Sequence, residues 1–158
     1  MSISTLVVVA VILFVIGNIM GLKPKASEVR VGDMRLFARK LDLNPKLVPI
    51  PDWLVGVADK GGMIAQYTLI NDEWRLPARY LLWIDGAWQG DTVLDILPPK
   101  FCESYIKGVM LKANCVTIYW QDEPYAKSFS VRDERAMTVI EQDLMQLQAF
   151  LVEMGNQP

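Results

Sequence analysis

The sequence contains no histidine. This absence excludes Ser–His and Cys–His nucleophile pairs, histidine metal sites and histidine-based pH switches. Cysteine is scarce as well, because Cys102 and Cys115 are the only two in the chain, and two cysteines alone do not make a zinc site. In a reducing compartment we expect both to be free thiols, and buried thiols of this kind act as small apolar groups.

Common nucleotide-binding and hydrolase motifs are also missing: there is no G-x-G-x-x-G, no Walker A pattern and no G-x-S-x-G. Two acidic pairs, Asp72-Glu73 and Asp122-Glu123, have the chemistry to hold a divalent cation or to share a proton, but both fall at predicted turns, where acidic residues are common. We therefore expect no enzymatic activity, no cofactor and no metal. A membrane-tethered enzyme that uses carboxylates and a metal is kept as an alternative.

Charge is absent from residues 3–22, and residues 6–16 form an unbroken apolar run. A helix of about 20 residues, rising about 1.5 Å per residue, spans the hydrocarbon layer of a bilayer. We predict a transmembrane helix over residues 1–22. A cleaved signal peptide is the alternative, but such peptides carry basic residues before the apolar region and a small-residue cleavage site after it, and neither pattern is present.

Positive charge is concentrated directly after the apolar run. Six basic residues lie there: Lys23, Lys25, Arg30, Arg35, Arg39 and Lys40. Basic flanks stay on the cytoplasmic side, which predicts an inner-membrane protein with its N-terminus outside and its domain in the cytoplasm. The six cations either contact anionic membrane lipids, at about 1 kcal/mol each, or only fix the topology. Residues 41–158 carry 10 basic and 16 acidic residues, which argues against nucleic acid as a partner.

The predicted membrane helix ends in Gly17-Asn18-Ile19-Met20-Gly21. The G-x-x-x-G spacing lets two helices approach closely, and Asn18 can hydrogen-bond across such a contact. We expect this face to associate with a second copy of the chain or with another membrane protein. The alternative is that the glycines only mark the end of the helix.

Residues 23–52 read as a basic juxtamembrane neck followed by a proline-rich connector. An apolar stripe predicts an amphipathic helix over residues 26–43, interrupted or slowed near Gly32. The stripe consists of Val29, Met34, Leu36, Phe37 and Leu41. Such a helix lies on the membrane surface or packs on the domain, and the moderate stripe favours packing. Pro45, Pro49 and Pro51 then predict an extended connector.

Residues 53–158 read as one globular α+β domain with a small antiparallel sheet packed by a C-terminal helix. Alternating or β-rich segments predict strands at 63–70, 79–84, 87–89 and 115–120, with a hairpin turn at Asp85-Gly86. Pro99 predicts the start of a helix over 99–112. A last helix is expected from a Ser130 cap, with Asp133 in the capping-box position, to a stop at Gly155. Its apolar stripe is Met137, Ile140, Leu144, Leu147 and Leu151, which favours packing on the sheet over a short coiled coil.

All five tryptophans lie in the predicted domain. Trp74 sits in a polar loop beside Arg75, and Trp88 follows the hairpin turn. Exposed tryptophan next to arginine is typical of a protein interface. We therefore predict that Trp74, Arg75 and Trp88 belong to an edge that binds a partner, formed by residues 71–79 and the hairpin.

Two segments carry a family resemblance: Met34-Arg35-Leu36-x-Ala38-Arg39-Lys40-Leu41-x-Leu43 in the neck and Trp74-Arg75-Leu76-Pro77 in the domain. Their order, after an anchor and before the remaining strands, resembles a family of small γ-proteobacterial single-pass envelope proteins that includes the ciprofloxacin tolerance protein AciT. Some relatives are described as accessory subunits of the preprotein translocase. The resemblance carries over no catalytic residues.

The resemblance implies a role in envelope integrity and antibiotic tolerance. Together with the composition, it predicts a non-enzymatic, membrane-anchored interaction or scaffold protein that supports the envelope, cell division or antibiotic tolerance. Its expected partners are membrane lipids and an unidentified membrane or membrane-associated protein. An accessory subunit of a membrane complex such as the preprotein translocase is the alternative.

Overall fold

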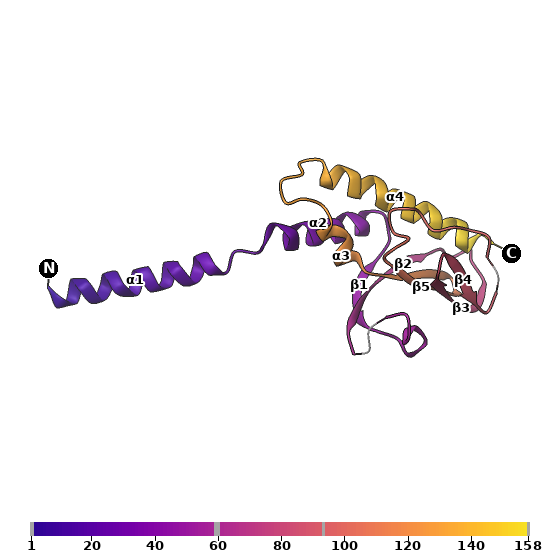
Figure 1. Cartoon of the computed structure of the whole chain (residues 1–158), viewed down its shortest axis with the longest axis horizontal. Helices are drawn as coiled ribbons and strands as arrows, with labels where there is room; N and C mark the ends of the chain where they lie inside the picture. The colour runs from indigo at the N-terminus through magenta and orange to yellow at the C-terminus, as the bar shows by residue number, and fades with distance from the viewer. Residues whose placement is uncertain (1, 59–60, 93, 158) are drawn as a thin grey trace.

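The computed structural model describes residues 2–58, 61–92 and 94–157. Helix α1 (Ile3–Gly21) projects away from a folded domain, to which residues 22–25 join it (Figure 1). None of the side chains of α1 is buried, although the helix is almost entirely apolar. Its length and composition suit either a membrane span or a signal sequence. The predicted apolar helix is therefore confirmed.

Helix α2 (Ala26–Lys40) confirms the predicted neck helix, but it runs through Gly32 without a break. It packs on the domain, beside α3 (Asp122–Lys127) and α4 (Ala136–Gly155). Val31, Met34 and Ala38 are buried, whereas Val29 and Leu36 of the predicted stripe are exposed. The structure thus shows α2 packed on the domain. The face that it buries is rotated about the helix axis relative to the predicted apolar stripe.

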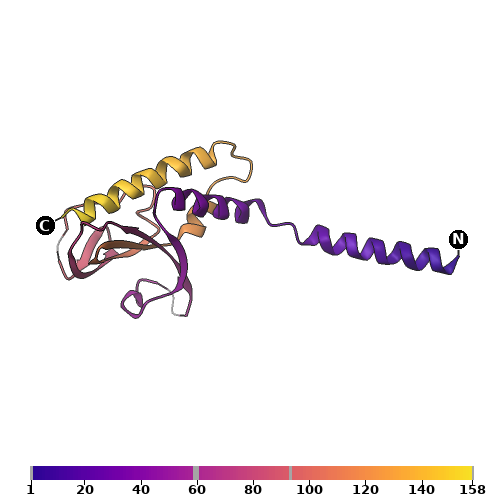
Figure 2. The same ribbon diagram turned by 180° about the vertical axis from the view of Figure 1, so that it is seen from behind.

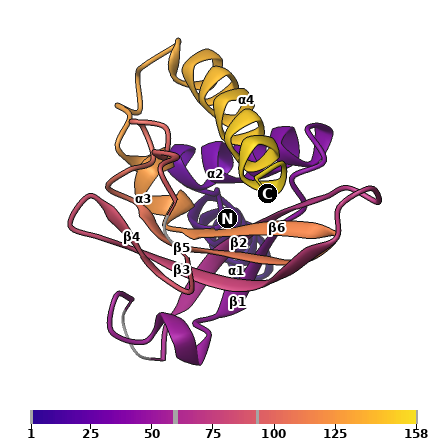
Figure 3. The same ribbon diagram turned by 90° about the vertical axis from the view of Figure 1, so that its right-hand side faces the viewer.

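In the described residues, six strands form a single antiparallel sheet in the order β1-β2-β6-β5-β3-β4. Their bounds are β1 (Pro45–Pro49), β2 (Met63–Ile70), β3 (Leu76–Ile84), β4 (Ala87–Gly90), β5 (Ile106–Ala113) and β6 (Cys115–Trp120). Helices α2 and α4 lie over one face of the sheet (Figure 3). The loop that contains the 3₁₀ turn η1 (Asp52–Leu54) hangs from the other face (Figure 2). The predicted α+β class and the helix-packed sheet are confirmed.

The predicted helix over 99–112 is wrong. Residues 99–105 form turns, in which the Cys102 N–H donates to Pro99, and the rest is the central strand β5. Strand β5 pairs with β3 on one side and β6 on the other, so its backbone groups are satisfied along both edges. The helix was predicted from Pro99 as a first helical residue. Pairing with two strands and burial outweigh this local preference.

Four further predictions of where elements begin or end also differ from the structure. The proline connector is partly the edge strand β1, and the predicted acidic turn is the start of α3. Helix α4 begins at Ala136 rather than after a Ser130 cap, because the Ser130 and Asp133 side chains accept hydrogen bonds from Arg132 and Arg135 in the preceding turn. Gly155 is the last residue of α4 rather than a residue beyond it.

The core lies between the sheet and the helices. Four members of the α4 stripe, Ile140, Leu144, Leu147 and Leu151, are completely buried, which confirms packing over a coiled coil. A smaller apolar cluster forms on the opposite face around Leu54, Ile64 and Tyr119, under the η1 loop. Both faces of the sheet are therefore packed, and in the part of the chain that the structure describes α-helices cover one of them.

Candidate functional site

The most polar buried feature of the domain is centred on Asp122, the first residue of α3, which is 2 % exposed. Arg35 of α2 donates from Nε to Asp122 Oδ2 at 2.7 Å and from Nη2 to Oδ1 at 2.9 Å. The Tyr67 hydroxyl of β2 donates to Oδ2 at 3.0 Å. We call this set of three side chains the Asp122 cluster. It ties two helices and the sheet together at one point.

Charge and burial raise the pKa values of two members of the Asp122 cluster, Arg35 and Tyr67. The hydrogen bonds that Arg35 donates to Asp122 raise the pKa of its guanidinium. Burial raises the pKa of the Tyr67 hydroxyl well above its usual value, and the neighbouring carboxylate raises it further. Both groups therefore keep their protons near neutral pH. The cluster is an ion pair with one phenol donor, and it links α2, α3 and β2 through hydrogen bonds between side chains.

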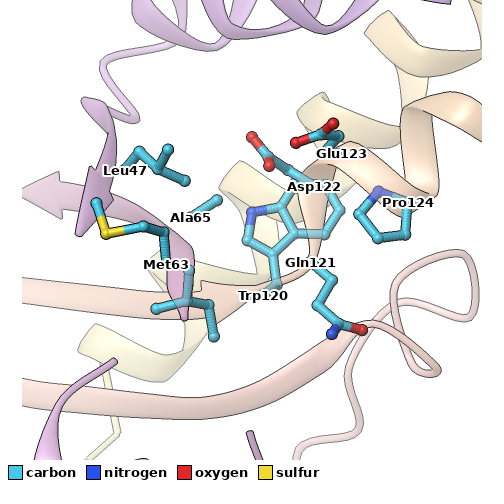
Figure 4. A pocket seen from close by; sticks show the side chains of 9 residues that line it. Leu47, Met63, Ala65, Trp120, Gln121, Asp122, Glu123 and Pro124 are labelled. Atoms are coloured by element: carbon cyan, nitrogen blue, oxygen red, sulfur yellow. The ribbon is translucent and has the colours of Figure 1, made fainter. Parts of the chain in front are cut away.

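A small cavity opens beside the Asp122 cluster, at the edge of the sheet formed by β1 and β2. Its volume is about 130 Å³. We call it the Trp120 notch, and Figure 4 shows its lining side chains, which include Leu47, Met63, Ala65, Trp120, Asp122 and Glu123. The notch combines an apolar wall from the strands with a polar wall from the start of α3. Apolar pockets that contain a few converging polar groups are typical of binding sites.

The nitrogen of Trp120 distinguishes this cavity from the rest of the surface. Trp120 is completely buried, and its Nε1 has no hydrogen-bond acceptor among the described residues. Trp74 and Trp88 are the contrast, because their Nε1 groups donate to Asn156 Oδ1 at 3.0 Å and to the Ile96 carbonyl at 2.6 Å. In Figure 4 the Trp120 nitrogen faces the space between Ala65, Leu47 and Asp122. The indole N–H is therefore an unused donor in the wall of the notch, with almost no accessible surface.

The prediction that Trp74 and Trp88 are exposed interface residues is wrong. They are only 6 % and 8 % exposed. Trp74 packs on the end of α4, where a Cβ added at Gly155 would lie 2.3 Å from its ring. The Trp88 ring stacks against Phe150 of α4 at 6.3 Å. Helix α4, distant in sequence, covers both rings.

Arg75 is the exposed member of the predicted edge, and its Nη1 donates to the carbonyls of Asp72 and Trp74. The guanidinium thus braces its own loop. With both tryptophans in the core, the structure does not assemble the three residues into one exposed binding edge.

The six basic residues of the predicted neck divide into two groups. Arg30 is 8 % exposed and donates to the carbonyls of Ala126, Phe129 and Ser130, while Arg35 belongs to the Asp122 cluster. The prediction that these two lie at the membrane surface is corrected by their internal contacts. The other four are exposed: Lys23, Lys25, Arg39 and Lys40.

Gly17, Asn18 and Gly21 are exposed along α1, and no neighbouring atom lies within 4 Å of a Cβ added at either glycine. Association through this face stays a prediction. Cys102 and Cys115 are free thiols, as expected. Burial raises the pKa of the Cys102 thiol strongly, so that it is a poor nucleophile.

The acidic pairs do not form a metal centre in the part of the chain that the structure describes. Within residues 2–58, 61–92 and 94–157, no group of three or more Cys, Asp or Glu side chains is arranged to hold an ion. Asp72 accepts a hydrogen bond from Asn114, and Glu123 pairs with Lys127. Asp122 accepts from Arg35 and Tyr67, so the cation beside its carboxylate is the Arg35 guanidinium.

Sequence reasoning missed Trp120 and Tyr67 as site residues, because each reads as an ordinary member of a β segment. Their place in the site depends on Asp122, which lies 55 residues from Tyr67 in the chain. One local signal existed: Leu47 lies between Pro45 and Pro49, a pattern typical of a strand with an unpaired edge.

Comparisons with protein-family models, with curated proteins and with solved structures find no match to this chain. The resemblance to small γ-proteobacterial envelope proteins therefore rests on the two sequence segments quoted above and stays a prediction.

Proposed function

We propose that this protein is a non-enzymatic interaction module, anchored by α1 in a bacterial inner membrane, with its α+β domain in the cytoplasm. Its role is to support envelope integrity, cell division or antibiotic tolerance by holding the domain close to membrane-bound partners. One observation carries the proposal: α1 is long, apolar and free of any packing against the domain. Such a helix needs another apolar environment, and a bilayer supplies it.

The contacts of α2 support a domain held near the membrane. Arg30 and Arg35 fix α2 to the segment 122–130, and only residues 22–25 separate α2 from α1. Lys23 and Lys25 in this linker favour the cytoplasmic side. A short tether raises the effective concentration of the domain for partners in the same membrane, so that weak contacts suffice.

The chemistry of the buried groups supports a non-enzymatic role. The Asp122 carboxylate is held by Arg35 and Tyr67, and the Cys102 thiol has a raised pKa. Neither group is poised for proton transfer or nucleophilic attack near neutral pH. Binding by surface complementarity needs no such group.

Anchoring is tested by extracting cell membranes at alkaline pH and measuring the mass of the intact protein. We expect the full chain in the membrane pellet, and we expect Ile12→Arg to move it to the supernatant because a charge at the helix centre disfavours insertion. Ile12→Leu is the matched control. A soluble product that lacks α1 would contradict the proposal, since it would show that α1 is a cleaved signal sequence.

A further inference from the structure

The Trp120 notch lies on the helix-covered face of the sheet, at a corner that the helices leave open. Leu47 and Ala65 are cross-strand partners on this face, and Met63 lies two residues before Ala65 on the same strand. Leu47 is 50 % exposed and Met63 is 55 % exposed, although both belong to strands that border the core. Two large apolar side chains thus flank a cavity that contains a buried donor.

The free donor gives the notch its chemical preference. A buried N–H without an acceptor costs about 1–3 kcal/mol, which an acceptor that enters the cavity recovers. Asp122 on the opposite wall already accepts from Arg35 and Tyr67, but a carboxylate has about four lone-pair sites and can accept from a further N–H. One donor and one acceptor facing a single cavity match the C=O and N–H of peptide groups.

The size of the notch limits its occupant to a short segment. Its 130 Å³ is close to the volume of about 150 Å³ in which an engineered apolar cavity holds one benzene molecule. One aliphatic side chain with its peptide group is of this size. Larger ligands would extend beyond the notch over Leu47 and Met63.

The edge of β1 disfavours a long added strand. The Ile50 N–H donates to the Gly62 carbonyl at 3.2 Å. In an antiparallel pair, every second residue directs its N–H and C=O toward the neighbouring strand, so this bond fixes which residues of β1 do so. Lys46 and Val48 then direct their backbone groups toward β2, and Pro45, Leu47 and Pro49 direct theirs outward. The two prolines have no N–H, so Leu47 is the one outward donor of this edge. A strand that paired along β1 would lack donors, whereas a short segment at Leu47 would not.

Charge around the notch favours a basic ligand. Glu123 is exposed and lines both the notch and a neighbouring groove along α2, which also includes Glu28 and Arg35. Glu123 pairs with Lys127 across one helical turn, an exposed contact that contributes little and can be exchanged. Glu28 lies near the start of α2, next to the linker to α1. The carboxylates of Glu123 and Glu28 thus line the route from the notch to the start of α2, a groove that Arg35 also lines.

We propose that the Trp120 notch binds a short apolar and basic peptide segment of a membrane protein, immediately cytoplasmic to its membrane helix. A backbone carbonyl of the segment accepts from Trp120 Nε1, and its N–H donates to Asp122. An aliphatic side chain packs against Leu47 and Met63, and a Lys or Arg contacts Glu123. Because segments at this position are rich in Lys and Arg, the source of the peptide rests on the proposed cytoplasmic anchoring.

The test uses the full chain, labelled with ¹⁵N at tryptophan, in detergent micelles. The probe is acetyl-Leu-Lys-Leu-Lys-amide, and the comparison peptide is acetyl-Leu-Glu-Leu-Glu-amide. The indole signal of Trp120 is identified by its loss in Trp120→Phe. We expect the basic peptide to shift this signal downfield and saturably, and the acidic peptide to shift it much less, while the other four indole signals stay in place.

Substitutions at exposed positions show where the peptide binds. Leu47→Lys and Met63→Lys each remove an apolar contact and repel the basic peptide, so we expect each to weaken binding by about tenfold. Ile70→Lys is the matched control, because Ile70 lies on the same strand as Met63, is 54 % exposed and projects from the opposite face. We expect binding by this variant to change less than twofold.

Three results would overturn the proposal. The first is an unmoved Trp120 signal at up to about 10 mM basic peptide, well above a millimolar Kd. The second is an equal response to the acidic peptide. The third is an equal loss of binding in Ile70→Lys. If the Trp120 N–H bonds only to water when peptide is present, its signal stays unmoved, and this outcome counts as the first result.

The membrane experiments decide separately on the proposed function. No peptide binding by a chain that is anchored and cytoplasmic overturns the notch proposal alone. Peptide binding by a domain that lies outside the membrane barrier overturns the cytoplasmic source of the segment and the proposed location, while the chemistry of the notch stands.

Discussion

Arg35 contacts Asp122 through two hydrogen bonds, of 2.7 and 2.9 Å, that join residues 87 positions apart in the chain. Arg35 retains 28 % side-chain exposure, whereas Asp122 is 2 % exposed. This unequal burial decides which partner tolerates the loss of the other. A stranded Arg35 can reach solvent, but a stranded Asp122 cannot.

Arg35→Met is therefore expected to cost more than Asp122→Asn. The first leaves a buried carboxylate with Tyr67 alone, and we expect a loss of about 3–5 kcal/mol. The second leaves a partly exposed cation, and we expect a loss of about 1.5–3 kcal/mol. Urea unfolding of the full chain in detergent, followed by tryptophan fluorescence, measures both. A larger loss in Asp122→Asn would contradict this account of the cluster.

Trp74 is predicted to be a core residue with no direct part in partner binding. Trp74→Ala removes the ring that packs on Gly155 and the donor to Asn156, and we expect the free energy of unfolding to fall by about 3–5 kcal/mol. The neighbouring exposed residue gives the control, since Arg75→Ala should change stability by less than about 1 kcal/mol. Unchanged stability in Trp74→Ala would contradict the core role of Trp74 and would favour the predicted role in partner binding.

Stability is expected to decline in alkaline solution. Burial raises the pKa values of Tyr67, Tyr125 and Cys102 in the folded domain. In the unfolded chain these groups ionise at their ordinary values, from about pH 8.5 for cysteine and about 10 for tyrosine. Their contribution is thus complete below those values and is lost as the pH rises through and beyond them.

The pH dependence is measured by urea unfolding between pH 7 and 11. We expect a steepening loss above about pH 9, with a slope of up to about 1.4 kcal/mol per pH unit for each group. Tyr67→Phe should reduce the slope above about pH 10 by removing one group. A slope that is the same in Tyr67→Phe and the natural chain would show that Tyr67 does not contribute.

Gly17 and Gly21 are predicted to mediate association of α1. Replacing both by Leu fills the surface across which a second helix would approach, and we expect energy transfer between labelled copies in a bilayer to require about tenfold more protein. Val11→Leu and Ile12→Leu together provide a control away from the glycine face. Association that survives both glycine substitutions would show that the glycines only mark the end of the helix.

Local patterns in the sequence predicted several elements well. The apolar run at 3–22, the alternation at 63–70 and the stripe from Ile140 to Leu151 each specify an element without help from the rest of the chain. Residues 106–112 were wrongly predicted to be helical because strand β5 depends on two neighbouring strands that pair with it. Pairing partners of this kind are not visible in a local window.

The site was harder to predict than the fold, because its members meet only in three dimensions. Asp122 was noticed as part of an acidic pair, but its role depends on Arg35 and Tyr67. Trp74 looked exposed because its sequence neighbours are polar, whereas Asn156 and Gly155 at the far end of the chain cover it. When a distant segment buries a residue, the sequence next to that residue does not indicate the burial.

The most direct test of the account is the topology of the domain, measured with C-terminal fusions to alkaline phosphatase and to a fluorescent protein. We predict fluorescence without phosphatase activity, which would place the domain in the cytoplasm beside basic juxtamembrane segments. Phosphatase activity without fluorescence would place the domain outside. That result would contradict the charge-based orientation and would move the search for partners to the cell wall.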